Sequence, residues 1–172
     1  EELYDLKSDP HELVNLATDL KHRDRLAAMR KALYQRMTET RDMGLIPEPI
    51  LEDVGREAGN KYLAFLRNDH SEQTRRLIDV IAAGEANDGA KLLQYAKSAD
   101  ASTRYWAAVW LGVYKTPAGK ATLLKLTTDP VPAVRVAAAQ ALCKFGDLSH
   151  LKVLVENVEN SNLLVGMFAL RA

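Results

Sequence analysis

The stretch DPVPAVRVAAAQALCKFGD, from Asp129 to Asp147, decides the fold. Its two prolines cannot continue a preceding helix, so they mark a turn, and the alanine-rich run from Ala133 to Gly146 favours a helix. A second helix is predicted from Asp147 to Val158. A two-helix unit of this size cannot bury its own apolar face, so we expect several units to stack into an α-solenoid.

The surrounding sequence supports stacking because it repeats with a period of 31 residues. Residues of like character recur in phase: Leu92, Leu123 and Leu154; Ala107, Ala138 and Ala169; Thr103, Val134 and Val165; Arg104 and Arg135. The period predicts repeats at about 70–98, 99–129 and 130–160, and a fourth that begins at Ser161 and is cut off at Ala172. Small side chains at Ala137, Ala138 and Ala141 would let neighbouring helices approach closely, with Val134 and Leu142 filling the space beside them.

The unit resembles a HEAT repeat: a proline-bearing turn, then V-R-x-A-A-A-x-A-L, then a small-residue break. The likeness covers residues 70–172 and implies a helical solenoid with an extended binding surface. It does not specify a function, because this architecture serves many partners.

The N-terminal stretch ELYDLKSDPHELVNLA, from Glu2 to Ala17, has a different pattern. Leu3–Leu6 is predicted to be a short strand. Asp9 suits an N-cap, Pro10 suits the first helical position and Glu12 would close a capping box, so a short helical turn should follow.

An amphipathic helix is predicted from Leu20 to Met43, with Gly44 as its left-handed C-terminal residue. Its apolar stripe is Leu26, Met29, Leu33 and Met37. Ile46–Ile50 should be extended, because each of its two prolines restricts the residue before it. Short helices are expected at Ile50–Arg56 and Lys61–Arg67.

The pattern E-L-Y-D-L-x-x-D-P-x-E-x-x-N-L-A resembles the C-terminal end of type I, formylglycine-dependent sulfatases, nearest to the sulfamidase-like and bacterial glycan-sulfatase branches. The resemblance implies that residues 1–50 are a strand-turn-helix portion of a sulfatase C-terminal subdomain, followed by a linker with transition helices (51–69) and the repeats (70–172). It further implies a hydrolase of sulfate esters or N-sulfates on a polysaccharide, with calcium and formylglycine held upstream, in a periplasmic or secreted protein. Because the chain opens directly on the strand, we expect it to be a non-catalytic C-terminal fragment of that enzyme.

No residue of this segment is assigned a catalytic, cofactor-binding or metal-binding role. The formylglycine precursor lies in the pattern C/S-x-P/A-x-R, which Cys143 does not match; around Ser8 the pattern has Glu12 in place of the arginine. Cys143 is expected to be a partly buried, inert thiol. The carboxylates of Glu52 and Asp53 show no sign of a glycosidase site.

The four histidines, His11, His22, His70 and His150, lack metal-ligand spacing and are predicted to be ordinary turn and helix residues. His11 has the best chance of touching a substrate, because it lies in the sulfatase-like turn.

Trp106, Trp110 and Tyr114 lie four residues apart and could form a carbohydrate-stacking platform. The 31-residue period instead places Trp106 on Ala137 and Trp110 on Ala141, which favours filling between repeats. Tyr105 is the better candidate for exposure.

Composition restricts the partners. With 23 basic and 23 acidic residues the chain has no net charge, which argues against nucleic acid as a partner, and no apolar run is long enough to span a bilayer. Two functions stay open: the C-terminal part of a sulfatase whose repeats contact glycan or protein, or a non-enzymatic HEAT-repeat scaffold or protein-binding module.

Overall fold

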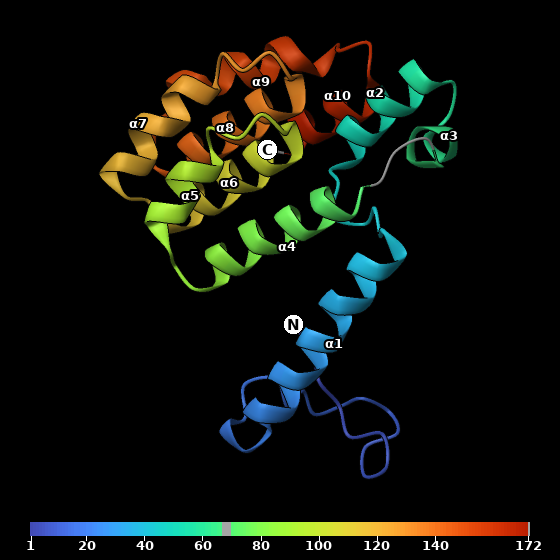
Figure 1. Cartoon of the computed structure of the whole chain (residues 1–172). Helices are drawn as coiled ribbons and strands as arrows, with labels where there is room; N and C mark the ends of the chain where they lie inside the picture. The colour runs from blue at the N-terminus through green and yellow to red at the C-terminus, as the bar shows by residue number, and fades with distance from the viewer. Residues whose placement is uncertain (67–69, 172) are drawn as a thin grey trace. The chain divides into compact units, whose positions relative to one another are not determined.

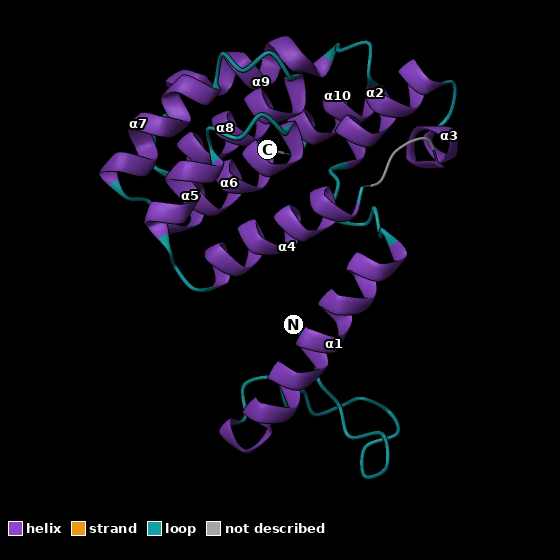
Figure 2. Cartoon of the chain, in the orientation of Figure 1, coloured by secondary structure: helices purple, strands orange, loops and turns teal. Residues whose placement is uncertain are grey.

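The computed structural model describes residues 1–66 and 70–171, and the regular secondary structure within these ranges is helical (Figure 2). The chain divides into two compact units, Glu1–Thr40 and Arg41–Ala172. The domain boundary expected near residue 69 falls beside the part of the chain that is not described.

The predicted strand at Leu3–Leu6 is wrong, since none of the described residues pairs with it as a second strand. A loop takes its place. The Leu3 amide donates to Asn15 Oδ1 at 3.1 Å, and the Leu3 carbonyl accepts from the Leu16 amide at 2.8 Å. The two ends of the sulfatase-like stretch are thus joined by an asparagine side chain and one backbone hydrogen bond.

The helical turn expected after Pro10 is also absent. Glu12 adopts a left-handed conformation (φ 55°), which ends the turn at once. The Asp9 carboxylate still caps backbone donors, but they belong to the loop: it accepts from the Leu13 amide at 3.1 Å and from the Val14 amide at 2.8 Å.

The long helix of the first unit is shorter than predicted. A 3-10 turn, η1 (Leu20–His22), precedes α1 (Arg23–Thr40), and the left-handed residue after the helix is Arg41 (φ 54°) rather than Gly44. The Asp42 carboxylate accepts from the Gly44 amide at 2.7 Å, so a side-chain-capped turn ends the helix where a glycine was expected. No residue of α1 is buried, and two of its apolar residues, Met29 and Leu33, are more than half exposed.

The second unit contains the helical repeats (Figure 1). Its helices are α2 (Glu48–Ala58), α3 (Lys61–Leu66), α4 (Ser71–Glu85), α5 (Gly89–Tyr95), α6 (Ala101–Tyr114), α7 (Pro117–Leu126), α8 (Pro132–Lys144), α9 (Leu151–Val158) and α10 (Leu163–Leu170), with a 3-10 turn, η2 (Leu148–His150), before α9. Helices α4, α6, α8 and α10 pack on one another in sequence, and we call them the first layer. Helices α5, α7 and α9 form the second layer, each packed against the first-layer helices before and after it.

In the first layer α6, α8 and α10 begin at Ala101, Pro132 and Leu163, 31 residues apart. The predicted packing residues are buried as well. Val134 and Leu142 have no exposed surface, and Ala137, Ala138 and Ala141 are at most 2% exposed.

The extended conformation predicted for Ile46–Ile50 is wrong in its second half, because α2 already begins at Glu48. Pro49 lies in the first turn, where its missing N–H would have no helical acceptor in any case, so the proline is tolerated. The helix expected over Lys61–Arg67 is present as α3, whereas Arg67 lies outside the described residues.

An ion pair between α7 and the turn before α9 makes a pH-dependent contribution to the folding stability of the second unit. Lys120 Nζ lies 3.0 Å from Asp147 Oδ2. The Ser149 hydroxyl, which donates to Asp147, and the Lys120 ammonium lower the pKa of Asp147 from 3.8 to about 2. Because the folded-state pKa is below the unfolded value, the contribution is fully present above about pH 4 and is lost as the pH falls through about 2.

We therefore expect a carboxyl ¹³C titration by NMR to give Asp147 a midpoint near 2 in the native chain. Lys120→Met should move that midpoint upward, because the cation that favours the carboxylate is removed. An unchanged midpoint in this variant would show that Lys120 does not act on Asp147.

Candidate functional site

A segment before the repeats lies against the first layer, and we call residues 41–58 the strap. It begins beside α4, where the Thr74 hydroxyl donates to the Asp42 carbonyl at 3.3 Å. At α6 the Trp106 indole Nε1 donates to the Leu45 carbonyl at 2.7 Å. Both strap carbonyls are therefore bound by side chains from the repeats.

The strap is anchored at its other end by Asn162, the N-cap residue of α10. The Asn162 amide donates to the Pro49 carbonyl and to Asp53 Oδ1, both at 2.8 Å, and its oxygen accepts from the Leu164 amide at 3.1 Å. Ile46 and Ile50 of the strap join the hydrophobic core of the repeats. The strap thus links α4, α6 and α10, which nearest-neighbour stacking alone does not do.

This anchor yields a prediction. Asn162→Ala removes three hydrogen bonds and leaves the Pro49 carbonyl without its donor, at a position where Asn162 itself is 2% exposed. We expect amide hydrogen exchange of Ile50 and Leu51, which open with the strap, to become about tenfold faster. Asn160→Ala serves as the control, since Asn160 caps only the turn before α10. Equal exchange rates in both variants would show that Asn162 does not hold the strap.

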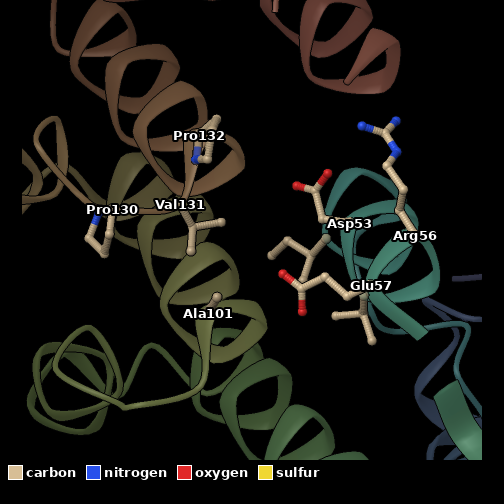
Figure 3. A pocket seen from close by; sticks show the side chains of 9 residues that line it. Asp53, Arg56, Glu57, Ala101, Pro130, Val131 and Pro132 are labelled. Carbon is tan, nitrogen blue, oxygen red and sulfur yellow. The ribbon is translucent and has the colours of Figure 1, made fainter. Parts of the chain in front are cut away.

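A cleft of about 500 Å³ remains between the strap helix α2 and the loops that precede α6 and α8. One wall consists of Ile50, Asp53, Val54, Arg56 and Glu57; the other consists of Ala101, Pro130, Val131 and Pro132. In Figure 3 the Asp53 and Glu57 carboxylates project from α2 toward the wall that carries Val131. The cleft therefore has one acidic and one apolar wall.

Two half-buried arginines fix the apolar wall. The Arg104 guanidinium holds the Asp129 carboxylate and also donates to the Ser98 and Ala99 carbonyls at 2.9 Å. Arg135 donates to the Asp129 carbonyl at 2.8 Å and to the Pro130 carbonyl at 3.2 Å. With these loop carbonyls occupied, the loops present apolar side chains to the cleft.

The carboxylates of the acidic wall are not paired with the nearby cations, which lie at Glu52, a residue outside the cleft. Glu52 forms ion pairs with both nearby cations: Lys61 Nζ lies 2.8 Å and Arg56 Nη2 lies 3.8 Å from its carboxylate oxygens. The hydrogen bond and charge of Lys61 lower the pKa of Glu52. Among the described residues, Glu57 makes no hydrogen bond or ion pair, and Asp53 bonds only to Asn162.

Residues 89–165 match the family model of HEAT repeats. The matched segment runs from the first residue of α5 into the first turn of α10. No curated protein and no solved structure matches the chain. No sulfatase family match supports the resemblance of Glu2–Ala17. The helical solenoid with HEAT-like repeats is therefore shown, and the cleft lies on its first layer.

The HEAT-like packing accounts for two of the three predicted stacking residues. Trp110 and Tyr114 stack with ring centroids 6.2 Å apart, Trp110 lies against Gly84, and the Tyr114 hydroxyl donates to the Gly84 carbonyl. They fill the space between α4 and α6, as predicted. Trp106 also packs against the core of the repeats, and its indole N–H holds the strap.

Tyr105 was predicted to be exposed, and this is wrong: it is 8% exposed. Its ring makes edge contacts with Trp106 and with Phe168 of α10. One period on, Tyr105 corresponds to Val136, which is fully buried, so the position faces the neighbouring repeat.

The remaining candidates are not brought together. His11 is exposed, and His22, His70 and His150 lie on separate elements. Within residues 1–66 and 70–171, no group of three potential ligand side chains could hold a metal ion. Cys143 is half-buried, and burial raises the pKa of its thiol. None of the described helices is both long and apolar enough to cross a bilayer.

Asn162 and Glu57 are the functional candidates that sequence reasoning missed, and Asp53 was considered there only as part of a glycosidase site. Asn162 could have been recognised as an N-cap, because it stands directly before the apolar run of α10. Its contact with Pro49 bridges 113 positions and leaves no local signal.

Proposed function

We propose that residues 41–171 act as a protein-binding module, with the cleft between α2 and the α6 and α8 loops as its contact surface. The observation that carries this proposal is the HEAT-like stack itself, in which a cleft lies between α2 and the N-terminal ends of α6 and α8. Stacked repeats create extended surfaces suited to macromolecular partners. A glycan-stacking role has less support, because the aromatic residues of α6 pack between helices or hold the strap: Trp110 and Tyr114 lie against α4, and Trp106 binds the Leu45 carbonyl.

Site-specific photo-crosslinking tests this proposal. Benzoylphenylalanine would replace Val54, which lies in the cleft and is 38% exposed, in the full chain incubated with an extract of the source organism. The matched control places it at Leu124 of α7, which is 42% exposed on the second layer. We expect a discrete crosslinked protein at Val54 and none at Leu124. Identical products at both positions, or none at either, would contradict the proposal.

A second proposal concerns the first unit. We propose that Glu1–Thr40 forms the C-terminal portion of a formylglycine-dependent sulfatase acting on a sulfated glycan. Its support is the residue pattern of Glu2–Ala17, together with the capping contacts of Asp9 and Asn15, which give a physical reason for those residue types at those spacings. In this proposal calcium and formylglycine belong to the part of the enzyme upstream of Glu1, as the family resemblance implies.

The coding sequence upstream of Glu1 decides this second proposal. A C/S-x-P/A-x-R pattern in the same reading frame, with sulfate release from a chromogenic sulfate ester by the whole gene product, is the expected result. An upstream sequence made only of further helical repeats would overturn it and leave the binding module as the function.

A further inference from the structure

The cleft on the first layer has a chemical character that points to one kind of side chain. Its acidic wall carries Asp53 and Glu57, one helical turn apart on α2 and therefore on the same face. Figure 3 shows both carboxylates directed into the cleft, while Arg56, which also lines it, extends above Asp53. An entering group thus meets two negative charges side by side.

These two carboxylates retain unused acceptors. Asp53 bonds Asn162 through Oδ1, and no described residue donates to its Oδ2. Glu57 is exposed and has no partner among the described residues, while the neighbouring cations Arg56 and Lys61 are both directed at Glu52. The acidic wall is therefore available to a cation from outside the chain.

The opposite wall suits the rest of a long basic side chain. Ala101, Pro130, Val131 and Pro132 offer aliphatic surface, and the loop carbonyls behind them are occupied by Arg104 and Arg135. Long cationic side chains lay their methylene stems on apolar surface and keep the charged head at a polar partner. The volume of about 500 Å³ is within the range of ligand pockets.

We propose that the cleft binds an arginine side chain of the partner protein, with the guanidinium between Asp53 and Glu57 and the stem against Val131. Arginine is preferred over lysine because its planar fork offers several donors and can meet two carboxylates at once. This inference rests on the proposed binding function and adds the chemistry of the contact.

A short-peptide titration tests the inference without a known partner. The probe is the capped tripeptide acetyl-Ala-Arg-Ala-amide, added to the ¹⁵N-labelled full chain; the matched probe carries citrulline, a neutral isostere, in place of arginine. We expect millimolar binding of the arginine peptide, with amide shifts at Val54, Glu57, Ala101 and Val131. The citrulline peptide should bind at least fivefold more weakly.

Variants then locate the contact. Glu57→Gln should weaken arginine-peptide binding about threefold to fivefold, as expected for one exposed charge pair. Asp53→Asn should do the same while its amide oxygen still accepts from Asn162. Glu156→Gln on α9 removes the same charge from the second layer and should change nothing.

Shifts confined to other surfaces, equal binding of citrulline, or an unaltered affinity in Glu57→Gln would overturn the inference. The outcome is separable from that of the binding module: crosslinking at Val54 without arginine selectivity would remove only the arginine contact. Failure of both experiments would remove the module as well.

Discussion

Asp129→Ala is expected to lower the free energy of unfolding by about 3–5 kcal/mol, the amount typical of breaking a buried ion pair from one side. The Arg104 guanidinium donates through Nε to Asp129 Oδ2 at 2.7 Å and through Nη2 to Oδ1 at 2.9 Å. Their side chains are 13% and 5% exposed, so little water reaches the pair. Urea unfolding followed by circular dichroism measures the change.

The ion pair lies at a junction that its neighbours do not reproduce. Arg104 belongs to α6, and Asp129 stands in the loop before α8, where its Oδ1 also accepts from the Val131 amide. At the preceding junction the neutral Gln73 donates to Asp100 at 2.8 Å. At the following one the nearest side-chain acceptor of Arg135 is Asn157, at 3.5 Å. The central junction alone among these three carries a full bidentate pair.

This difference supplies the control. Gln73→Ala removes the neutral donor to Asp100 at the equivalent position, together with the Gln73 contact to His70, and should cost about 1 kcal/mol. The double variant Arg104→Met/Asp129→Ala should be less destabilised than the sum of its single variants, because no unpaired charge is left buried. A loss below about 1 kcal/mol in Asp129→Ala, or strict additivity, would show that the pair does not hold this junction.

The repeats could be predicted from the sequence because their signal is carried by side-chain size at a fixed period. Ala138 and Val134 lie where neighbouring helices of the stack pack together, and the same packing constrains the equivalent positions of the other repeats. The same test, applied to Tyr105, would have predicted its burial, since Val136 occupies that position one period later. The predicted strand at Leu3–Leu6 failed for the opposite reason: a strand needs a partner, and an alternating pattern cannot supply one.

The strap and the cleft could not be predicted in the same way. Trp106 and Asn162 hold the strap through the carbonyls of Leu45 and Pro49, and every residue carries a carbonyl, so the acceptors leave no trace in the sequence. One carboxylate of the acidic wall, Asp53, stands beside Glu52 in the sequence, but the sequence does not say which of the two Lys61 neutralises. That choice is made by the tertiary structure.

Gly112→Val is expected to cost about 3 kcal/mol, the upper part of the usual range for overpacking, because α8 leaves no room for a Cβ at this position of α6. A Cβ added at Gly112 would lie 2.6 Å from the Ala141 Cβ and 2.9 Å from its Cα. The second atom is backbone, so the two helices would have to separate rather than merely rotate a side chain. Valine has a higher helix propensity than glycine, so any loss of stability in urea reports packing between repeats.

Two further variants isolate this close approach. Gly89→Val makes the same change at the start of α5, where an added Cβ meets no atom within 4 Å, and should alter stability by less than about 0.5 kcal/mol. Ala141→Gly in the Gly112→Val background removes the nearer of the two clashing atoms and should recover part of the loss, measured against Ala141→Gly alone. Should Gly112→Val match Gly89→Val, the α6–α8 contact would be able to absorb a side chain, and close approach through small residues would not be what fixes the stacking of the repeats.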